Sequence, residues 1–239
     1  MKDINSFTDN KGWFEMPTGP TGVRPSNPVA GQIKYDTTEN VLEYYNPAVT
    51  GWRIVTSSAE YMNATGGTVT TDGDYKVHTF NSSATFTITQ INSNSQFVQY
   101  LVVGGGGGGH GGFQSPGGGG GGAGGFLTAA NFAVAVQSYS ITVGAGGAKG
   151  IGDGPSVTQR PTAGGDSIFS TITANGGGYG GGYQSFSAGN GGSGGGEAWG
   201  GGAGTGTSGQ GKSGGAAASG NTTQNGGGGG GKGAAGGTA

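Results

Sequence analysis

The strongest formal match to a chemical motif lies at residues 206–213, which read Gly-Thr-Ser-Gly-Gln-Gly-Lys-Ser and fit the phosphate-binding pattern G-x-x-x-x-G-K-[ST]. That chemistry needs a buried strand before the loop and a helix after it, so that backbone N–H groups and the helix terminus enclose a phosphate. The flanking residues 199–204 and 214–218 are glycine- and alanine-rich and predict neither element. We therefore interpret the match as a coincidence of composition, and discount G-x-G-x-x-G matches inside the glycine runs for the same reason.

Other chemistry-bearing residues are sparse. His78 and His110 are isolated from any metal-like spacing, and Asp72-Gly73-Asp74 is typical of a turn. The chain contains no cysteine, so disulfides and thiolate metal sites are excluded. No Ser/His/Asp or paired-carboxylate arrangement stands out. The sequence thus predicts a protein that is not an enzyme and that has no cofactor and no metal site.

A set of aromatic and polar residues interrupts the glycine tracts and supplies the candidate binding residues. They are His110, Phe113, Gln114, Tyr179, Tyr183, Gln184, Phe186 and Trp199, with Glu197 nearby. One interpretation is that loops between rigid tracts present them to a receptor, because aromatic side chains give a large contact area at low entropic cost. The other is that they cap the tracts or pack against a β layer. A glycan or a protein loop would serve equally as the receptor.

Short apolar strands that run directly into glycine must position these residues. Residues 97–103 pass into six glycines, residues 139–143 enter Gly-Ala-Gly-Gly, and residues 168–175 enter three glycines. Apolar and polar residues alternate in residues 84–89 and place Phe86 and Ile88 on one face. This pattern favours antiparallel sheets with one face exposed to solvent. Residues 127–136 are ambiguous and could form a helical turn or two.

All but eight of the 63 glycines lie between Gly104 and Ala239. Collagen is excluded because these glycines are contiguous. Glycine can instead form polyproline-II helices, which have three residues per turn, no internal hydrogen bonds and no Cβ to prevent close packing. Three runs of six glycines, at 104–109, 117–122 and 226–231, have equal lengths that suit a stacked array. The alternative is a disordered linker, since ordering each residue costs roughly 1–2 kcal/mol.

Charge and hydropathy limit the classes of partner that the chain can bind. The net charge is -2 with only ten Lys and Arg, which argues against nucleic acid. No window approaches the roughly 18–20 apolar residues of a membrane span, and the N-terminus lacks the apolar region of a secretory signal. We expect a soluble protein synthesised in a cytoplasm and not inserted in a membrane.

The N-terminal part predicts a β-meander. The stretches 24–36, 41–46 and 51–55 read as three short strands, with turns at 36–40 and 46–50. Some thirty residues can hardly bury enough surface to stand alone, so we expect this unit to associate with copies of itself or with a larger neighbour.

Two resemblances add to this interpretation. The stretch P-x-x-G-Q-I-x-Y-D-T-x-x-x-x-L-E-x-Y followed by G-W, covering residues 24–55, resembles a short module of bacteriophage virion proteins. The pattern T-F-x-x-S-x-T-F-T-I-T, then L-V-V-G-G-G-G-G-G, S-I-T-V-G-A-G-G and G-G-D-S-x-F resembles the glycine-rich domains of tail-fibre-tip adhesins of T-even-like phages. The second resemblance implies an all-β fold with polyglycine-II helical layers. It extends to no receptor-contacting loop.

Together these observations predict a polar segment at 1–24, a β-meander virion module at 25–58 and a glycine-rich domain at 59–239. Because such domains usually close with an apolar strand, the last domain is expected to lack its closing strand or to receive it from a partner. The resemblance implies a homotrimeric virion fibre, an external appendage made in the host cytoplasm. Expected partners are other virion proteins and a host surface glycan or outer-membrane protein. A head or neck fibre or decoration protein without receptor binding, and an ice-binding protein, are the functional alternatives.

Overall fold

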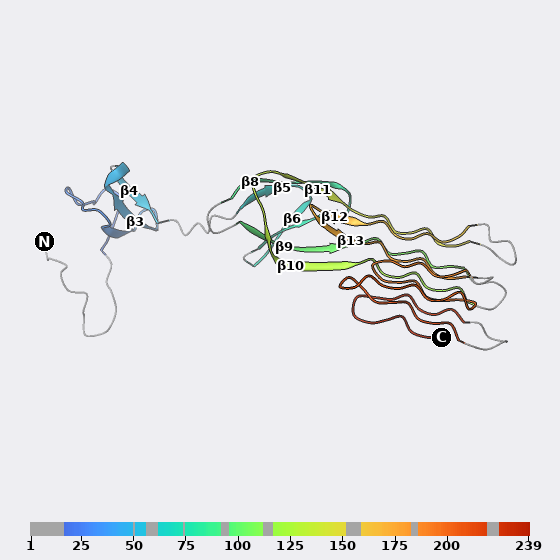
Figure 1. The fold of residues 1–239 in the computed structure, drawn as a ribbon. Coiled ribbons are helices and arrows are strands. Elements are labelled where there is room, and N and C mark those ends of the chain that lie inside the picture. Colours follow the sequence, from blue (N-terminus) through green and yellow to red (C-terminus); the bar gives the residue numbers. More distant parts are fainter. Residues whose placement is uncertain are drawn as a thin grey trace, which may run out of the picture. The chain divides into compact units, whose positions relative to one another are not determined.

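A computed structural model describes residues 17–49, 51–55, 62–73, 75–91, 96–111, 117–151, 159–182, 186–218 and 225–239. The chain divides into two compact units, Met1–Ala59 and Glu60–Ala239, each with its own strands (Figure 1). Apart from one three-residue 3-10 turn, the regular elements of the described residues are all strands, which confirms the predicted all-β class. None of these residues belongs to a helix long and apolar enough to cross a bilayer.

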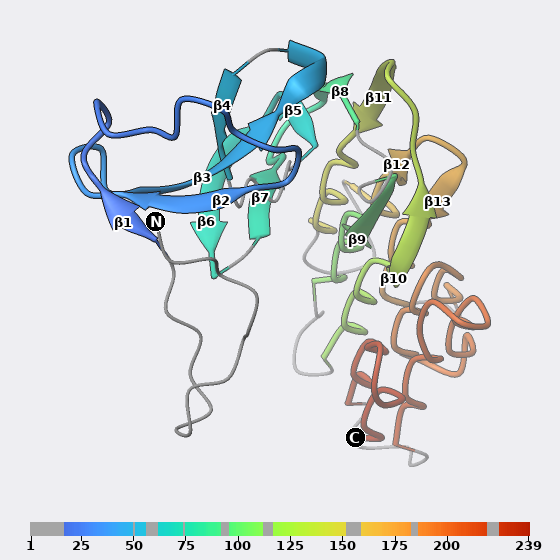
Figure 2. The same ribbon diagram turned by 90° about the vertical axis from the view of Figure 1, so that its left-hand side faces the viewer.

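The N-terminal unit is a four-stranded sheet in the order β1-β2-β3-β4 (Figure 2). Its elements are β1 (Thr18–Gly19), β2 (Ile33–Asp36), β3 (Val41–Asn46), the 3-10 turn η1 (Pro47–Val49) and β4 (Gly51–Ile54). The antiparallel pairs β2–β3 and β3–β4 confirm the three predicted strands and their turns. The first turn contains Asn40 at a φ of 57°, a left-handed conformation that asparagine tolerates. Parallel pairing of β1 with β2 was not predicted.

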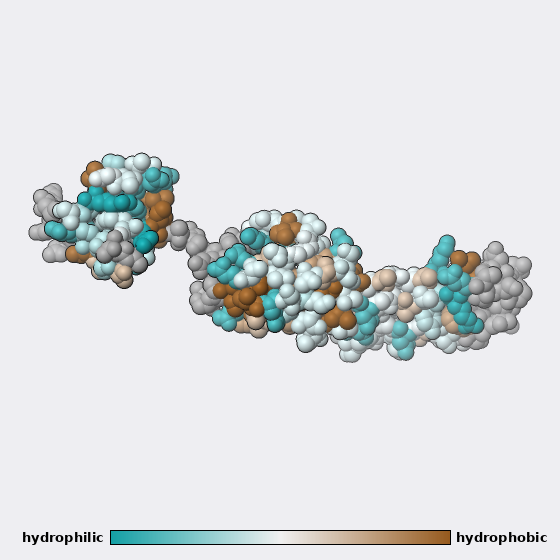
Figure 3. Space-filling model, turned by 90° about the horizontal axis from the view of Figure 1, so that it is seen from above, coloured by the Kyte–Doolittle hydropathy of each residue, from teal (hydrophilic) through white to brown (hydrophobic). Residues whose placement is uncertain are grey.

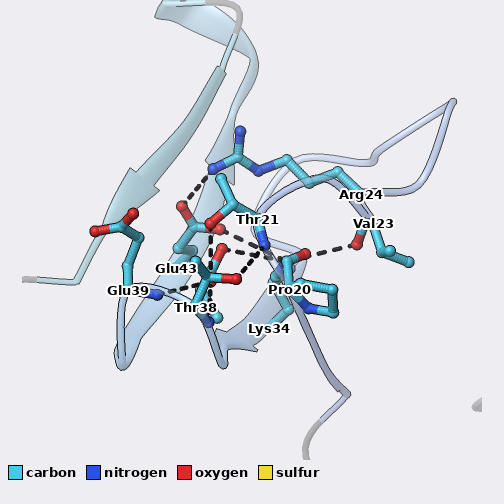
Figure 4. A network of polar contacts seen from close by, with 9 residues as sticks. Pro20, Thr21, Val23, Arg24, Lys34, Thr38, Glu39 and Glu43 are labelled. Atoms are coloured by element: carbon cyan, nitrogen blue, oxygen red, sulfur yellow. Dashed lines mark hydrogen bonds and ion pairs between the residues drawn. The ribbon is translucent and has the colours of Figure 1, made fainter.

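Among the described residues of this unit, the buried side chains are the charged ones of Lys34, Asp36 and Glu43. Figure 4 shows the polar network around them. Lys34 Nζ lies 3.5 Å from Asp36 Oδ2 and 3.9 Å from Glu43 Oε2. Arg24 Nη2 contacts Glu43 Oε1 at 2.7 Å, and the Thr21 hydroxyl donates to Asp36 Oδ1 at 3.0 Å. These contacts tie the segment 17–25, which we call the strap, to one face of the β2–β3 hairpin.

The described residues of the second unit contain a β layer of nine strands. A five-stranded sheet has the order β13-β12-β11-β8-β5, and β9–β10 and β6–β7 form two antiparallel pairs. The strands are β5 (Asn63–Thr65), β6 (Thr68–Asp72), β7 (Tyr75–Thr79), β8 (Ala84–Gln90), β9 (Phe97–Val103), β10 (Phe126–Ala133), β11 (Ser138–Thr142), β12 (Ser167–Phe169) and β13 (Ile172–Ala174).

The core lies between these sheets. Phe86 and Ile88 are 8% and 1% exposed, which confirms the alternation predicted for β8. Phe86 stands edge-on to Phe169 with ring centroids 6.3 Å apart, and Phe169 contacts Phe132 at 5.0 Å. The buried apolar cluster comprises Phe86, Ile88, Val102, Val134, Tyr139, Phe169 and Ala174.

The structure resolves one ambiguous segment and revises one predicted strand. Residues 127–136, which could have formed a helical turn, are mostly in β10, which pairs with β9 through a register shift between Ala129 and Phe132. Residues 168–175, predicted as one strand, form the β12–β13 hairpin. The hairpin turns at Ser170 and Thr171, and Ser170 has a left-handed φ of 54°.

Glycine tracts leave the ends of β9, β11 and β13 and run side by side away from the β layer (Figures 1 and 2). The N–H groups of Gly104, Gly107 and His110 donate to the carbonyls of residues 125, 122 and 119 at 2.9–3.0 Å. Those of Gly105 and Gly108 donate to a different tract, at residues 165 and 162. Partners therefore recur every third residue, which is the repeat of a polyproline-II helix and confirms the polyglycine-II layers.

The equal glycine runs meet as expected. The tract at 117–125 bonds to 104–110 on one side and to 226–231 on another, through Gly120 N–H to the Gly227 carbonyl and Ala123 N–H to the Gly230 carbonyl, both at 3.0 Å. The last tract, at 235–239, bonds to the tract at 211–218. The Gly236 N–H group donates to the Ser213 carbonyl at 3.0 Å. That the domain lacks its closing strand, or receives one from a partner, stays a prediction.

Polar side chains fix where each tract begins. The Ser167 hydroxyl accepts from Gly144 N–H at 3.0 Å, and Asp166 Oδ1 accepts from Gly176 N–H at 2.8 Å. Gln210 accepts from Asn175 N–H at 2.8 Å and donates to the Thr173 carbonyl at 3.1 Å. Because glycine tracts have no side chains to define their register, these junctions define it for them.

Because neighbouring tracts pack closely, the tract 104–109 requires glycine at two positions of every three. A Cβ at Gly107 would lie 2.2 Å from the Gly178 carbonyl oxygen, and one at Gly108 would lie 1.9 Å from that of Ala148. At Gly106, by contrast, the nearest atom would be the Gly122 oxygen at 3.8 Å. Gly109 repeats the open position three residues later, with its nearest atom at 3.7 Å.

A matched pair of adjacent substitutions tests this packing. Gly107→Ala should lower the free energy of unfolding by about 3 kcal/mol or more, because the methyl group meets immobile backbone. Gly106→Ala should change it by less than about 1 kcal/mol, since the site is open. Chemical denaturation of the full-length variants measures both values. Equal effects at the two positions would contradict the packed array.

A second prediction concerns the buried carboxylate of Asp36. Burial alone would raise the pKa of Asp36, but hydrogen bonds from Glu39 N–H, the Thr21 hydroxyl and Thr38 N–H, with the charge of Lys34, hold that pKa below its usual value. A depressed pKa contributes stability that is present above the ordinary value of about 4 and is lost as the pH falls through the folded value. Amide-exchange protection of β2 and β3 should therefore fall in acid, and Asp36→Asn should remove that pH step. An unchanged step in the variant would assign it to another group.

Candidate binding site at the outer end of the glycine array

The tracts have an inner end at the β layer and an outer end away from it (Figure 1). The antiparallel bonds between 104–110 and 119–125 place Gly104 and Gly125 at the inner end, beside β9 and β10. They place His110 and Gly119 at the outer end. Described residues at the outer end are His110, Gly111, Gly117, Ile151, Gln159, Arg160, Gly182, Phe186, Trp199, Ala218 and Asn225.

Four side chains from different tracts meet at the outer end. Tyr179 and Phe186 are stacked, with ring centroids 5.4 Å apart and planes at 15°. The His110 ring lies 5.9 Å from that of Phe186. The guanidinium carbon of Arg160 lies 4.1 Å from the Phe186 ring centroid, within cation–π distance. We call these four residues the outer-end cluster.

Backbone pairing brings the cluster together. Gly182 N–H donates to the Phe186 carbonyl at 2.9 Å, which turns Phe186 back over the tract that contains Tyr179. Reciprocal bonds of 2.8 and 2.9 Å between Ile151 and Gln159 place Arg160 beside them. A Cβ at Gly182 would lie 2.4 Å from the His110 ring, so the ring occupies the space that this glycine leaves.

The cluster is suited to non-covalent binding. His110, Tyr179 and Phe186 are half-buried and Arg160 is exposed, so ring edges and a cation reach solvent. The His110 Nδ1 atom lies 2.6 Å from the Gly111 carbonyl oxygen, to which it donates, so the ring orientation is fixed. The cluster thus offers aromatic surface, a guanidinium and hydrogen-bonding groups on a preformed support.

The structure unites three of the eight candidate residues, His110, Tyr179 and Phe186. They contact one another across tracts instead of packing on the β layer. Trp199 occupies a separate outer-end turn at a φ of 54°. That turn is joined to the Phe186 segment, because the Ser187 hydroxyl donates to the Gly201 carbonyl at 2.5 Å. Four candidates lie outside the described residues: Phe113, Gln114, Tyr183 and Gln184.

Arg160 was missed by the sequence analysis. It is the only arginine between Gly104 and Ala239, and that isolation in a nearly uncharged region was the available signal. Its contact with Phe186, 26 positions further along the chain, could not be predicted because it depends on the register of three tracts.

The phosphate-binding match has no corresponding geometry. Residues 208–210 form a turn at the inner end, and no helix follows in the described residues up to 218. Gln210 in this turn bonds to backbone atoms of β13 and Asn175, so the segment is a junction between tract and sheet. His78 lies in β7 with its ring 5.1 Å from Phe86 and its Nδ1 2.8 Å from the Gly66 carbonyl oxygen. Among the described residues, no three His, Asp or Glu side chains are grouped to hold a metal.

A family model described as a glycine-rich domain matches residues 81–239. The chain belongs to this glycine-rich domain family. No curated protein and no solved structure matches the chain. The glycine-rich domain begins in the turn before β8 and includes every tract, so the outer-end cluster lies wholly within it.

The ring contacts predict a measurable role for Phe186 in the glycine-rich domain. Phe186→Ala removes two aromatic contacts and one cation–π contact and should lower the free energy of unfolding by about 2 kcal/mol. Phe97→Ala is the matched control, because Phe97 is 57% exposed and has no such ring partner among the described residues. Thermal or chemical denaturation measures the difference. Equal losses in the two variants would show that the cluster is not formed.

Proposed function

We propose that this chain is a bacteriophage virion fibre or adhesin, with an N-terminal part that attaches to the particle and a glycine-rich domain that binds a host receptor. The observation that carries the proposal is the convergence of His110, Arg160, Tyr179 and Phe186 at the outer end of the array. The resemblance of residues 24–55 to a phage virion module supports the location on an external appendage. A structural, non-enzymatic role fits both parts.

The array favours binding through its rigidity. Each tract is bonded to several neighbours, so side chains at its end lose little further freedom when a partner binds. Aromatic and arginine side chains are also the types that carry most binding energy at protein interfaces. The aromatic surface that reaches solvent would suit a glycan, and the guanidinium would suit a carboxylate or carbonyl of an outer-membrane protein loop.

Binding of the labelled full-length chain to a panel of intact bacterial strains tests the proposal. On a susceptible strain the chain should bind saturably and block adsorption of the phage that carries it. Arg160→Ala should weaken binding at least about ten-fold, the effect of losing a central contact. Lys212→Ala is the control, because Lys212 is exposed at the inner end.

The outcomes separate the alternatives. Failure of the unaltered chain to bind or to block adsorption would favour a head or neck fibre or decoration protein that has no receptor. If the chain binds saturably and Arg160→Ala leaves that binding unchanged, the chain is an adhesin whose receptor does not contact the outer-end cluster.

A further inference from the structure

The guanidinium of Arg160 is positioned by an aromatic ring and keeps its hydrogen-bonding capacity. Its central carbon lies 4.1 Å from the Phe186 ring centroid, so the ring holds the cation at the outer end. A contact of this kind uses none of the five N–H donors of the guanidinium for a hydrogen bond. Within the described residues, Arg160 forms no ion pair and no hydrogen bond through its side chain. The cation is therefore placed to bind an anion from outside the chain.

The charges near Arg160 favour an anion as well. Lys149 and Arg160 lie on the paired segments 148–151 and 159–162, which are bonded to each other at both ends, and both side chains are exposed. Glu197, an acidic residue in the outer half of the array, is half-buried, and its Oε2 accepts the N–H of residue 217 at 3.2 Å. Hydrophilic residues also gather toward the outer end of the array, whose tracts are otherwise close to neutral in hydropathy (Figure 3). Neighbouring cations attract a negatively charged partner more than a neutral one.

We propose that the outer-end cluster selects a sugar that carries a carboxylate, such as a uronic or sialic acid unit of an acidic surface polysaccharide. This inference rests on the proposed function and narrows its receptor to one chemical class. The guanidinium of Arg160 donates two parallel hydrogen bonds to the carboxylate, which is the pairing that its planar fork favours. A neutral sugar leaves this cation without a partner.

The His110 ring favours a sugar over an acidic side chain of a protein. Its Nδ1 donates to the Gly111 carbonyl at 2.6 Å, so Nε2 of the neutral ring is an acceptor. Among the described residues, none donates a hydrogen bond to Nε2. An ionised carboxylate cannot donate a hydrogen bond, whereas the hydroxyl groups of a sugar can. One acidic sugar therefore supplies both an acceptor for Arg160 and a donor for His110.

The small size of the outer-end cluster also fits a sugar. Its other three groups lie 4.1–5.9 Å from the Phe186 ring centroid. Neighbouring tract positions, such as 117–119 and 180–182, are glycine and offer no side chain to a partner. A specific protein interface covers about 800 Å² on each partner. Four side chains surrounded by glycine match one or two sugar units better than a surface of that size.

Binding of the full-length chain to an array of immobilised oligosaccharides tests the proposal. The array carries glucuronic, galacturonic and sialic acid units, each beside a counterpart in which the carboxylate has been chemically reduced to an alcohol. The chain should bind acidic members of the array, and reduction of the carboxylate should weaken that binding at least about ten-fold. Added salt should also weaken binding to the acidic members, because it screens an exposed cation.

Two variants and a control separate the shape of the guanidinium from its charge. Arg160→Lys keeps a cation over the ring but removes the planar fork, and should weaken binding to acidic sugars at least about ten-fold. Lys149→Ala removes only a neighbouring charge and should have a smaller effect. Lys212→Ala is the control and should bind as the unaltered chain does, because Lys212 is exposed at the inner end. Chemical denaturation of each variant shows whether the array is still folded.

Each outcome supports or overturns the proposal. Equal binding to acidic sugars and their reduced counterparts, or binding to no acidic member, overturns it. Arg160→Lys that binds as tightly as the unaltered chain overturns it as well. A chain that binds acidic sugars but no bacterial strain contradicts the proposed function and leaves this inference intact. A chain that binds bacteria but no acidic sugar, and loses that binding when the cells are treated with protease, is an adhesin for a protein receptor and contradicts this inference alone.

Discussion

The glycine-rich domain depends on hydrogen bonds between backbones that carry no side chains. A polyproline-II helix satisfies none of its own N–H and C=O groups, so each tract must be surrounded by others to remain folded. The bonds of Gly104, Gly107 and His110 to one neighbour, and of Gly105 and Gly108 to another, show how a single tract is shared. Any Cβ directed at such a neighbour would occupy the place of a carbonyl oxygen. The domain therefore requires glycine wherever the backbone of one tract packs directly against that of another.

The β layer supplies what the tracts cannot supply for themselves. Its aromatic core around Phe86 and Phe169 holds the strand ends in fixed positions, and the tracts continue from those ends. Side chains such as Asp166 and Gln210 then set the first bond of a tract. The N-terminal unit is built differently, since the side chains buried among its described residues are the charged ones of Lys34, Asp36 and Glu43.

Sequence patterns predict the fold where side chains alternate. The strand-to-glycine transitions, the β-meander and the inward faces of Phe86 and Ile88 all follow from periodicity, and the structure confirms them. The β12–β13 hairpin could not be predicted, because its turn at Ser170 carries no glycine, proline or asparagine. Register between tracts was also beyond prediction, since consecutive glycines are identical. For that reason Phe186 and Tyr179 could be identified as candidates from the sequence, but neither their contact with each other nor the role of Arg160 could be predicted.

Residue-resolved amide hydrogen exchange in the first glycine tract tests the central claim most directly. If neighbouring backbones satisfy one another, the N–H groups of Gly104, Gly105, Gly107 and Gly108 exchange far more slowly than those of an unstructured glycine peptide. Exchange of all four at the rate of the free peptide would show that the tracts are not bonded laterally, and would contradict the account.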